Sequence, residues 1–500
     1  MTGPVLTFDL AGEAATARLG ADLAAAARAG DVFLLQGDLG AGKTTLARGF
    51  IRAMSANREL DVPSPTFTLV QTYEARIPIA HLDLYRIGSP GEVEELGLFD
   101  DANTSVILIE WPDRAAGFLP DHPVTIELSH HREGRQATIS GPPPLLARIS
   151  RSLCIRTFLV DAGYADAQRT FLLGDASTRA YETVDTEPVR ILMNAPRLPD
   201  GPPIRDGKPY SQIAHLAESV VPFVAVDKAL LANGFCAPSI DAQDLDQGLL
   251  LIEHLGTDTV LNADGSPIAE RYMAAAETLA AMHSANWSRD MEAAPGVIHH
   301  LPAYDREALG IETELVLDWY MPAIAGRPAS DQDRADYRAA WAGAFDRLEQ
   351  AEKSLVLRDY HSPNIIWRGD RTGNDRIGII DFQDGLWGPS AYDVASLAMD
   401  ARVTISRELE AQIVDAYRAA RRAEGGFDEA AFDEAYAIMA AQRNSKILGI
   451  FVRLNVRDGK PQYLKHLPRI RDYVERALAH PALAGVRAFY FGRGLIGGGQ

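Results

Sequence analysis

The chain has 500 residues, too many for one hydrophobic core, so we expect roughly two to four domains. Hydrophobic residues make up 47% and charged residues 23%, which excludes a mostly disordered chain. The formal net charge is −19, with 12 basic and 19 acidic residues up to residue 150 and 37 and 49 after it. Neither part is a basic module, so tight autonomous binding of DNA or RNA is not expected.

Only Cys154 and Cys236 are present, and neither lies in a Cys-x-x-Cys pair, so we expect two reduced thiols. The N-terminus lacks a basic start followed by an apolar core, which argues against a signal peptide. No apolar run approaches the ~18 residues of a membrane span. We therefore expect a cytoplasmic protein that makes no membrane contact.

The first part of the chain alternates between helical and strand-like patterns. An Ala-rich helical segment at 12–29 precedes a buried strand at 31–36, a Gly-rich turn and a helix to about Met54. Such alternation predicts an α/β domain over residues 1–140. The run Gly141-Pro-Pro-Pro144 predicts a stiff, exposed linker at 141–155. Further strands are expected at 79–84, 105–110, 124–127 and 136–139, the last two as a hairpin.

The second part, residues 156–490, has short strand-like runs first and helices later. The strands are expected at 171–175, 181–184 and 189–193, and helical stretches dominate after about residue 270. This order predicts an α+β domain.

A phosphate-binding loop is predicted between the strand at 31–36 and the helix that follows it. Residues 37–44 read Gly-Asp-Leu-Gly-Ala-Gly-Lys-Thr and fit G-x-x-x-x-G-K-[ST]. The glycines let backbone N–H groups point at one phosphate, Lys43 reaches the β- and γ-phosphates, and Thr44 joins the Mg²⁺ shell. The predicted nucleotide-binding residues are Gly37, Gly40, Gly42, Lys43, Thr44 and Thr45.

Two carboxylates at strand ends complete this site. Asp83 and Glu110 each end a strand-like run, where a carboxylate can hold Mg²⁺ or orient water. The segment Ser64-Pro65-Thr66 lies between the loop helix and the Asp83 strand, where switch segments of small NTPases lie.

Residues 5–140 resemble the TsaE family, the ATPase of the bacterial machinery that makes N6-threonylcarbamoyladenosine in tRNA. The resemblance rests on residues 37–44, 63–67, 81–86 and 109–112 in this order and spacing. It implies ATP on the loop, Mg²⁺ near Thr44 and Asp83, hydrolysis involving Glu110 and a switch role for Thr66. It also implies TsaB and TsaD proteins as partners, which would hold the tRNA. The alternative is a P-loop kinase of a small molecule, but ~140 residues leave little room for a substrate lid.

A kinase-like catalytic loop is predicted at 357–367. Asp359 and Asn364 fit D-x-x-x-x-N, and Asp381 follows an apolar run at 377–380. In kinase-like enzymes these residues act as base and as two Mg²⁺ ligands. The segments 364–367 and 377–380 are expected to pair as a hairpin, which would bring the three side chains together. Upstream, Ser177 and Thr178 lie in a Gly-containing turn that is a candidate phosphate cover.

Residues 155–490 resemble the aminoglycoside phosphotransferase superfamily, and within it the anomeric N-acetylmuramate and N-acetylglucosamine kinases (AmgK). Besides the catalytic loop, the resemblance rests on residues 174–181, 191–196, 248–256, 392–396 and 442–451. It implies a protein-kinase-like, two-lobed fold that uses ATP and Mg²⁺ on an amino sugar. Candidate sugar-binding residues are Asp384, Glu314, Trp319, Arg443 and Asn444. Asp393 is expected to brace the catalytic loop.

The sequence departs from the superfamily pattern at two points. Leu357 stands where a His is usual, and the strand at 190–194 carries no phosphate-pairing Lys. Arg190 could substitute, or the Ser177 turn and the metal could hold the phosphates alone. A regulatory pseudokinase, and a kinase of aminoglycosides or choline, are the alternatives for this half. A nucleotide-dependent assembly module with negligible turnover is the alternative for the first half.

Overall fold

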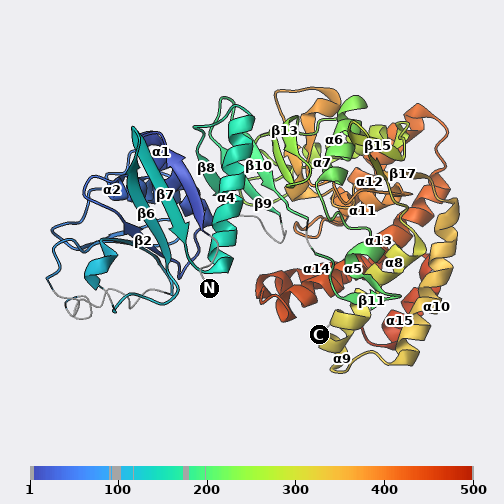
Figure 1. Ribbon diagram of the computed structural model, residues 1–500. Coiled ribbons are helices and arrows are strands. Elements are labelled where there is room, and N and C mark those ends of the chain that lie inside the picture. The colour runs from blue at the N-terminus through green and yellow to red at the C-terminus, as the bar shows by residue number, and fades with distance from the viewer. Residues whose placement is uncertain are drawn as a thin grey trace. The chain divides into compact units, whose positions relative to one another are not determined.

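The computed structural model describes residues 5–88, 92, 103–115, 117–172, 179–197 and 199–497. The chain divides into two compact units (Figure 1). The first comprises Met1–Asn194 with Asp241–Asp244 and Leu249–Ile252, and the second comprises Ala195–Ile240, Leu245–Gly248 and Glu253–Gln500.

A seven-stranded sheet forms the first part of the first unit. Its order is β1-β7-β6-β2-β5-β4-β3, in which β2 pairs in parallel with β5 and β6, and β4 pairs in parallel with β5. The predicted hairpin is confirmed, because β6 and β7 pair antiparallel. The elements are β1 Leu6–Leu10, α1 Glu13–Ala26, β2 Val32–Gln36, α2 Lys43–Met54, β3 Val70–Tyr73, β4 Ile79–Asp83, β5 Val106–Glu110, β6 Val124–His131, β7 Gly134–Ser140 and α4 Pro143–Asp161.

Alternation along β2 builds a core on each face of this sheet. Phe33 and Leu35 pack in the larger core, which includes side chains of α1, α2 and α4. Val32 and Leu34 point to the opposite face and pack in a smaller core with Leu84. The carboxyl ends of β2, β4 and β5 therefore meet at one edge, where ligands bind in sheets of this kind.

The expectation of an exposed linker at 141–155 is wrong. Helix α4 spans Pro143–Asp161, with Leu145, Leu146 and Ile149 buried. Proline is tolerated in the first helical turn because its missing N–H would be unpaired there anyway. In the sequence, the proline run precedes apolar residues at helical spacing, and this spacing specifies the helix. Whether 1–140 and 156–490 are separate domains stays a prediction.

A five-stranded sheet follows α4, in the order β13-β14-β10-β9-β8. Figure 1 shows α4 beside both α1 and these strands. The predicted strands at 181–184 and 189–193 are confirmed within one residue, and the described part of the first one ends at Leu172. The strands are β8 Arg169–Leu172, β9 Ala180–Val184, β10 Arg190–Asn194, β13 Ile240–Asp244 and β14 Leu249–Glu253.

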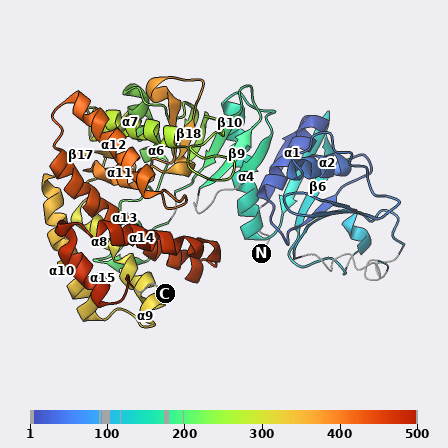
Figure 2. The same cartoon turned by 180° about the vertical axis from the view of Figure 1, so that it is seen from behind.

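The second unit is mainly helical, as expected after residue 270. Figure 2 shows α10 beside α15, in agreement with the contacts between them. No helix in the described ranges is long and apolar enough to cross a membrane. The elements are β11 Pro203–Arg205, β12 Lys208–Pro209, α5 Tyr210–Ile213, α6 Val221–Ala232, α7 Ala269–Ser284, β15 Asp290–Ala294, β16 Val297–His300, α8 Arg306–Thr313, α9 Met321–Ala325, α10 Asp331–Arg347, β17 Lys353–Val356, β18 Ile365–Trp367, β19 Ile377–Ile379, β20 Leu386–Pro389, α11 Ala391–Ala398, α12 Arg407–Glu424, α13 Glu429–Val456, α14 Leu467–Ala477 and α15 Ala484–Gly492.

Candidate functional sites

The loop between β2 and α2 has the backbone of a phosphate cradle. Gly37, Gly40 and Gly42 have φ of 135°, 79° and 107°, values that favour glycine. A Cβ atom on Gly37 would lie 2.2 Å from the carbonyl oxygen of Leu128. The loop can therefore take this path only without a side chain at residue 37, and it leads into the N-terminus of α2, where N–H groups favour an anion.

Lys43 is folded into the loop. Its Nζ donates to the carbonyl oxygens of Gly37 at 2.7 Å and Asp38 at 2.9 Å, and lies 3.6 Å from the centre of the Trp111 ring. Burial lowers the pKa of the Lys43 ammonium, although Glu110 acts to raise it. A buried ammonium held by carbonyl oxygens can exchange them for phosphate oxygens.

The two predicted carboxylates lie side by side at the sheet edge. Asp83 of β4 and Glu110 of β5 are register partners, and both are buried. Thr44 Oγ1 donates to Glu110 Oε2 at 2.9 Å, and Thr66 Oγ1 donates to Asp83 Oδ2 at 3.0 Å. Ser64 Oγ donates to the same Asp83 oxygen at 2.5 Å. This set of hydroxyl and carboxylate oxygens fits the oxygen-only preference of Mg²⁺.

His81 belongs to this site, although the sequence reasoning gave it no role. Its ring is fully buried, and Nε2 lies 3.0 Å from Glu110 Oε1. Within the described structure, its Nδ1 has no hydrogen-bond partner. The period of two along β4 places residues 81 and 83 on the same face, and this spacing was the available signal.

The predicted nucleotide-binding residue Thr45 takes no part in the contacts described above. Thr45 lines a cavity of about 340 Å³ together with Arg18 and Arg48. Ser177 and Thr178 lie outside the described residues.

The second unit brings Asp359, Asn364 and Asp381 together. The predicted hairpin is confirmed, because β18 and β19 pair antiparallel, with Ile365 opposite Ile379. Asn364 Nδ2 donates to the carbonyl oxygen of Asp359 at 2.9 Å and to Asp381 Oδ2 at 3.3 Å. Amide and carboxylate oxygens at this point fit Mg²⁺, as in the first site.

Asp393 braces the catalytic loop, as expected. Its carboxylate accepts the backbone N–H groups of Leu357 at 2.6 Å and Arg358 at 3.0 Å. Burial raises the pKa of Asp393 to about 7, although the two N–H groups act to lower it. Arg358 and Asp381 have φ of 69° and 61°, a strained conformation that persists only where the surroundings impose it.

Basic side chains act on the carboxyl group of Asp359. Burial acts to raise the pKa of this carboxyl, but His361, Lys446 and Arg358 outweigh burial and lower it. Asp359 is therefore held ionised, as a group that accepts a proton must be.

A buried charge cluster supports this loop, and sequence reasoning missed its centre. Glu312 of α8 accepts Lys446 Nζ at 2.8 Å and Gln442 Nε2 at 2.9 Å, and also accepts the Arg358 guanidinium and the Tyr304 hydroxyl. Nothing in the local sequence around Glu312 indicates a partner 134 residues away in another helix.

The predicted sugar-binding residues have structural partners. Glu314 pairs with Arg205 at 2.7 Å and Arg338 at 3.0 Å, and Asp384 accepts the N–H of Ala217 at 2.6 Å. Trp319 lies in the π-helical segment Val316–Tyr320. Arg443 and Asn444 are buried in α13, where Asn444 Nδ2 donates to the carbonyl oxygen of Ala440. Their role in sugar binding stays a prediction.

Arg190 does not stand free to replace the missing lysine. It forms an ion pair with Asp241 within its own sheet and donates to the carbonyl oxygen of Pro188 at 3.4 Å. Its role as a phosphate ligand stays a prediction.

Fold and sites together define a P-loop ATPase domain joined to a kinase-like phosphotransferase. Residues 10–137 match the family described as threonylcarbamoyl adenosine biosynthesis protein TsaE, and residues 168–432 match the phosphotransferase enzyme family. The chain belongs to the phosphotransferase enzyme family and carries a TsaE-family domain before it. The predicted fold class and both resemblances are confirmed.

Individual relatives agree with this division. An N-acetylmuramate/N-acetylglucosamine kinase of Caulobacter vibrioides is 36% identical over 345 residues, which cover 67% of this chain and 94% of that protein. A TsaE protein of Nostoc sp. is 41% identical over 138 residues, 26% of this chain and 83% of that protein. The solved microcompartment-associated aminopropanol kinase is 17% identical, with a TM-score of 0.44. The match covers 66% of this chain and 98% of that protein.

Proposed function

We propose that the kinase transfers the γ-phosphoryl group of ATP to the anomeric hydroxyl of N-acetylmuramate or N-acetylglucosamine, a reaction of cell-wall recycling. The observation that carries the proposal is the convergence of Asp359, Asn364 and Asp381. The choice of acceptor is supported by the relative of 36% identity, which carries this activity in its name.

In this proposal Asp359 accepts the proton of the sugar hydroxyl, while Asn364 and Asp381 would hold Mg²⁺. The metal would neutralise charge on the phosphates. Gln383 Nε2 donates to Asp381 Oδ1 at 2.7 Å and fixes the orientation of that carboxylate. Asp393 keeps the loop in place through the two backbone N–H groups that it accepts.

The name of the relative also favours an amino sugar over a cationic aminoglycoside or choline as the acceptor. A cationic acceptor would require several converging carboxylates near Asp359. The complete set of Asp359, Asn364 and Asp381 likewise argues against a pseudokinase.

The test is phosphate transfer from ATP to each sugar, with phosphorus NMR to locate the new bond. We expect an anomeric phosphate from the wild-type chain and a loss of at least ~100-fold in Asp359→Asn. Asp370→Asn is the matched control, because Asp370 lies nearby in sequence with a side chain 74% exposed. Transfer that persists in Asp359→Asn would refute Asp359 as the base. ATP binding with no transfer to either sugar would refute the acceptor and favour the pseudokinase.

We also propose that the TsaE-family domain hydrolyses ATP for tRNA threonylcarbamoyladenosine synthesis, with TsaB- and TsaD-like proteins as partners. Thr44 and Asp83 would hold Mg²⁺, Glu110 would orient the attacking water, and Thr66 would respond to the nucleotide. Support comes from the hydrogen bonds that join Thr44 to Glu110 and Thr66 to Asp83.

The test of this second proposal is ATP hydrolysis by the full chain, without sugar, in the presence and absence of the two partners. Glu110→Gln should reduce turnover at least ~100-fold while nucleotide still binds. Glu127→Gln is the control, since Glu127 is an exposed residue of β6 in the same sheet. Equal turnover in Glu110→Gln would contradict the proposal. Negligible wild-type turnover even with partners would favour the assembly-module alternative.

A further inference from the structure

Helix α4 contributes to two hydrophobic cores. Its first half places Leu145, Leu146 and Ile149 in the core of the seven-stranded sheet. Its second half places Ile155 and Leu159 in the core of the five-stranded sheet, with Val184, Leu192, Leu249 and Leu251. One continuous helix thus belongs to the ATPase domain at one end and to the first kinase sheet at the other.

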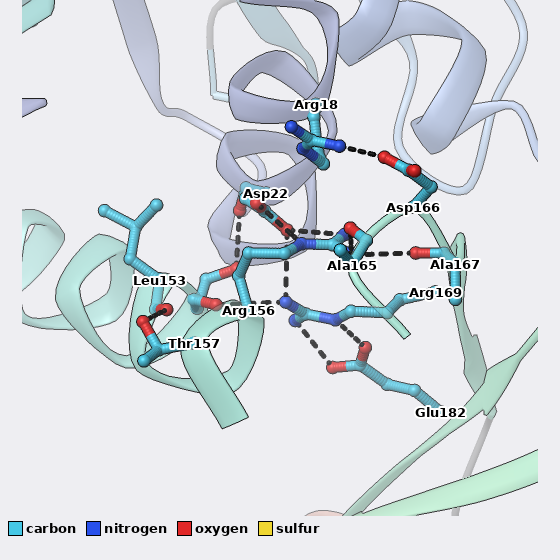
Figure 3. A network of polar contacts seen from close by, with 11 residues as sticks. Arg18, Asp22, Leu153, Arg156, Thr157, Ala165, Asp166, Ala167, Arg169 and Glu182 are labelled. Carbon is cyan, nitrogen blue, oxygen red and sulfur yellow. Dashed lines mark hydrogen bonds and ion pairs between the residues drawn. The ribbon is translucent and has the colours of Figure 1, made fainter. Parts of the chain in front are cut away.

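A buried ion network crosses the same boundary (Figure 3). Asp22 of α1 accepts Arg156 of α4 through bonds of 3.0 to 3.1 Å and Arg169 of β8 at 3.3 Å. Arg169 also donates to Glu182 of β9, at 2.6 and 3.2 Å. The side chains of Asp22 and Arg169 are each only 3% exposed. Two carboxylates and two guanidinium groups balance, so no net charge is buried.

Backbone atoms complete the network. Ser152 Oγ donates to the carbonyl oxygen of Asp22 at 2.6 Å, and Arg169 donates to the carbonyl oxygen of Ser152 at 3.0 Å. Arg156 donates to the carbonyl oxygens of Ala165 and Ala167, in the segment that leads into β8. These bonds fix where β8 starts relative to α1.

The rim of this boundary is polar. Arg18 of α1 pairs with Asp166, and Arg58 pairs with Asp185 and donates to Gln168 at 2.5 Å. The guanidinium of Arg76 lies 5.5 Å from the centre of the Phe171 ring. Exposed pairs of this kind contribute little to stability, but they favour one orientation of the two surfaces.

We propose that helix α1 of the ATPase domain is a docking surface for the first kinase sheet of the same chain, so that this five-stranded sheet and the ATPase domain form one cooperative folding unit. Helix α4 supplies the apolar contacts with the sheet, and Asp22 of α1 supplies the specific polar contacts through Arg156 and Arg169. Removing one member leaves a buried charge without its partner. This loss destabilises the fold by far more than the intact ion pair stabilises it. The five-stranded kinase sheet then depends on the ATPase domain for its stability.

Hydrogen exchange of the full chain tests this, because it reports the stability of each segment separately. In Asp22→Ala, exchange should speed up on the order of 100-fold in β9 and β10, which Asp22 does not touch, as well as in α1. Strand β17 of the second unit is the internal reference. Asp9→Ala is the control, since Asp9 is an exposed residue of the same domain bonded to Gln136.

A second variant keeps the test decisive if Asp22→Ala does not fold. Ser152→Ala removes one neutral hydroxyl beneath Asp22 and should speed exchange in β9 and β10 on the order of 10-fold. Unchanged exchange in these strands, in a folded Asp22→Ala or otherwise in Ser152→Ala, would overturn the proposal. This outcome is independent of either proposed activity, because neither reaction is measured.

Discussion

At the scale of single residues, buried charges in the kinase determine how stability depends on pH. Burial acts to raise the pKa of Glu312, but Lys446 and Arg358 outweigh it, and the pKa falls to about 2 from the 4.5 of a free side chain. A lowered carboxyl pKa stabilises the fold above pH 4.5, and the stabilisation is lost as pH falls toward 2.

Glu312→Gln should therefore lower the free energy of unfolding by ~3–5 kcal/mol at pH 7, because two buried cations lose their partner. The difference from the wild type should shrink as pH falls from 4.5 toward 2. Urea unfolding at pH 7 and pH 3 measures this. Glu307→Gln on the same helix is the control, since its side chain is 64% exposed. A pH-independent difference would contradict the argument.

For Asp227 of α6, stability depends on pH in the opposite direction. Burial raises its pKa to about 8, and its carboxylate has no hydrogen-bond partner in the described ranges. Between pH 4 and 8 the folded state retains a proton that the unfolded state loses, so stability falls as pH rises through this range. Asp227→Asn should remove this loss, so its stability relative to the wild type should rise by about 3–4 kcal/mol between pH 5 and pH 8. Unfolding curves at both values check the result, and an equal difference at both would refute it.

At the scale of elements, two glycines set the distance between α1 and α2. A Cβ atom on Gly49 would lie 2.1 Å from the carbonyl oxygen of Ala17, and one on Gly20 would lie 2.2 Å from that of Leu46. The backbones therefore touch, and α2 carries the phosphate loop at its N-terminus. Any substitution at these positions must push the two helices apart.

Gly49→Ala should accordingly destabilise the first unit by ~2 kcal/mol or more, against the gain of about 1 kcal/mol that alanine gives in a free helix. Gly343→Ala in α10 is the matched control, because a Cβ atom there meets nothing within 4 Å. This substitution should stabilise the second unit slightly. Thermal unfolding of each variant, together with hydrogen exchange measured separately for each unit, gives the effect of both substitutions. A stabilising Gly49→Ala would show that the helices separate at little cost.

At the scale of the whole molecule, two separate ATP-consuming sites should appear in one preparation. Lys43→Ala should abolish ADP formation that needs no sugar, because the loop loses its only lysine, and leave sugar-dependent ADP formation within about threefold. Asp359→Asn should do the reverse. A coupled ADP assay with and without sugar separates the two. Loss of both activities in either variant would contradict independent sites.

The sequence by itself determined both folds and indicated the residues of each candidate site. Glycine spacing at 37–42, the strand-end carboxylates Asp83 and Glu110, and the Asp359–Asn364–Asp381 set are local patterns, and the chemistry dictates their spacing. Hairpins such as β18–β19 were predictable because alternation and short connections specify register within a few residues.

Tertiary structure alone decided what depends on distant partners. His81 beside Glu110, Glu312 between Arg358 and Lys446, and Asp22 between Arg156 and Arg169 join residues that are far apart in the chain. Helix α4 reads as a linker until both cores that bury it are known. Burial and charge pairing are properties of the folded environment, so no local pattern in the sequence could specify them.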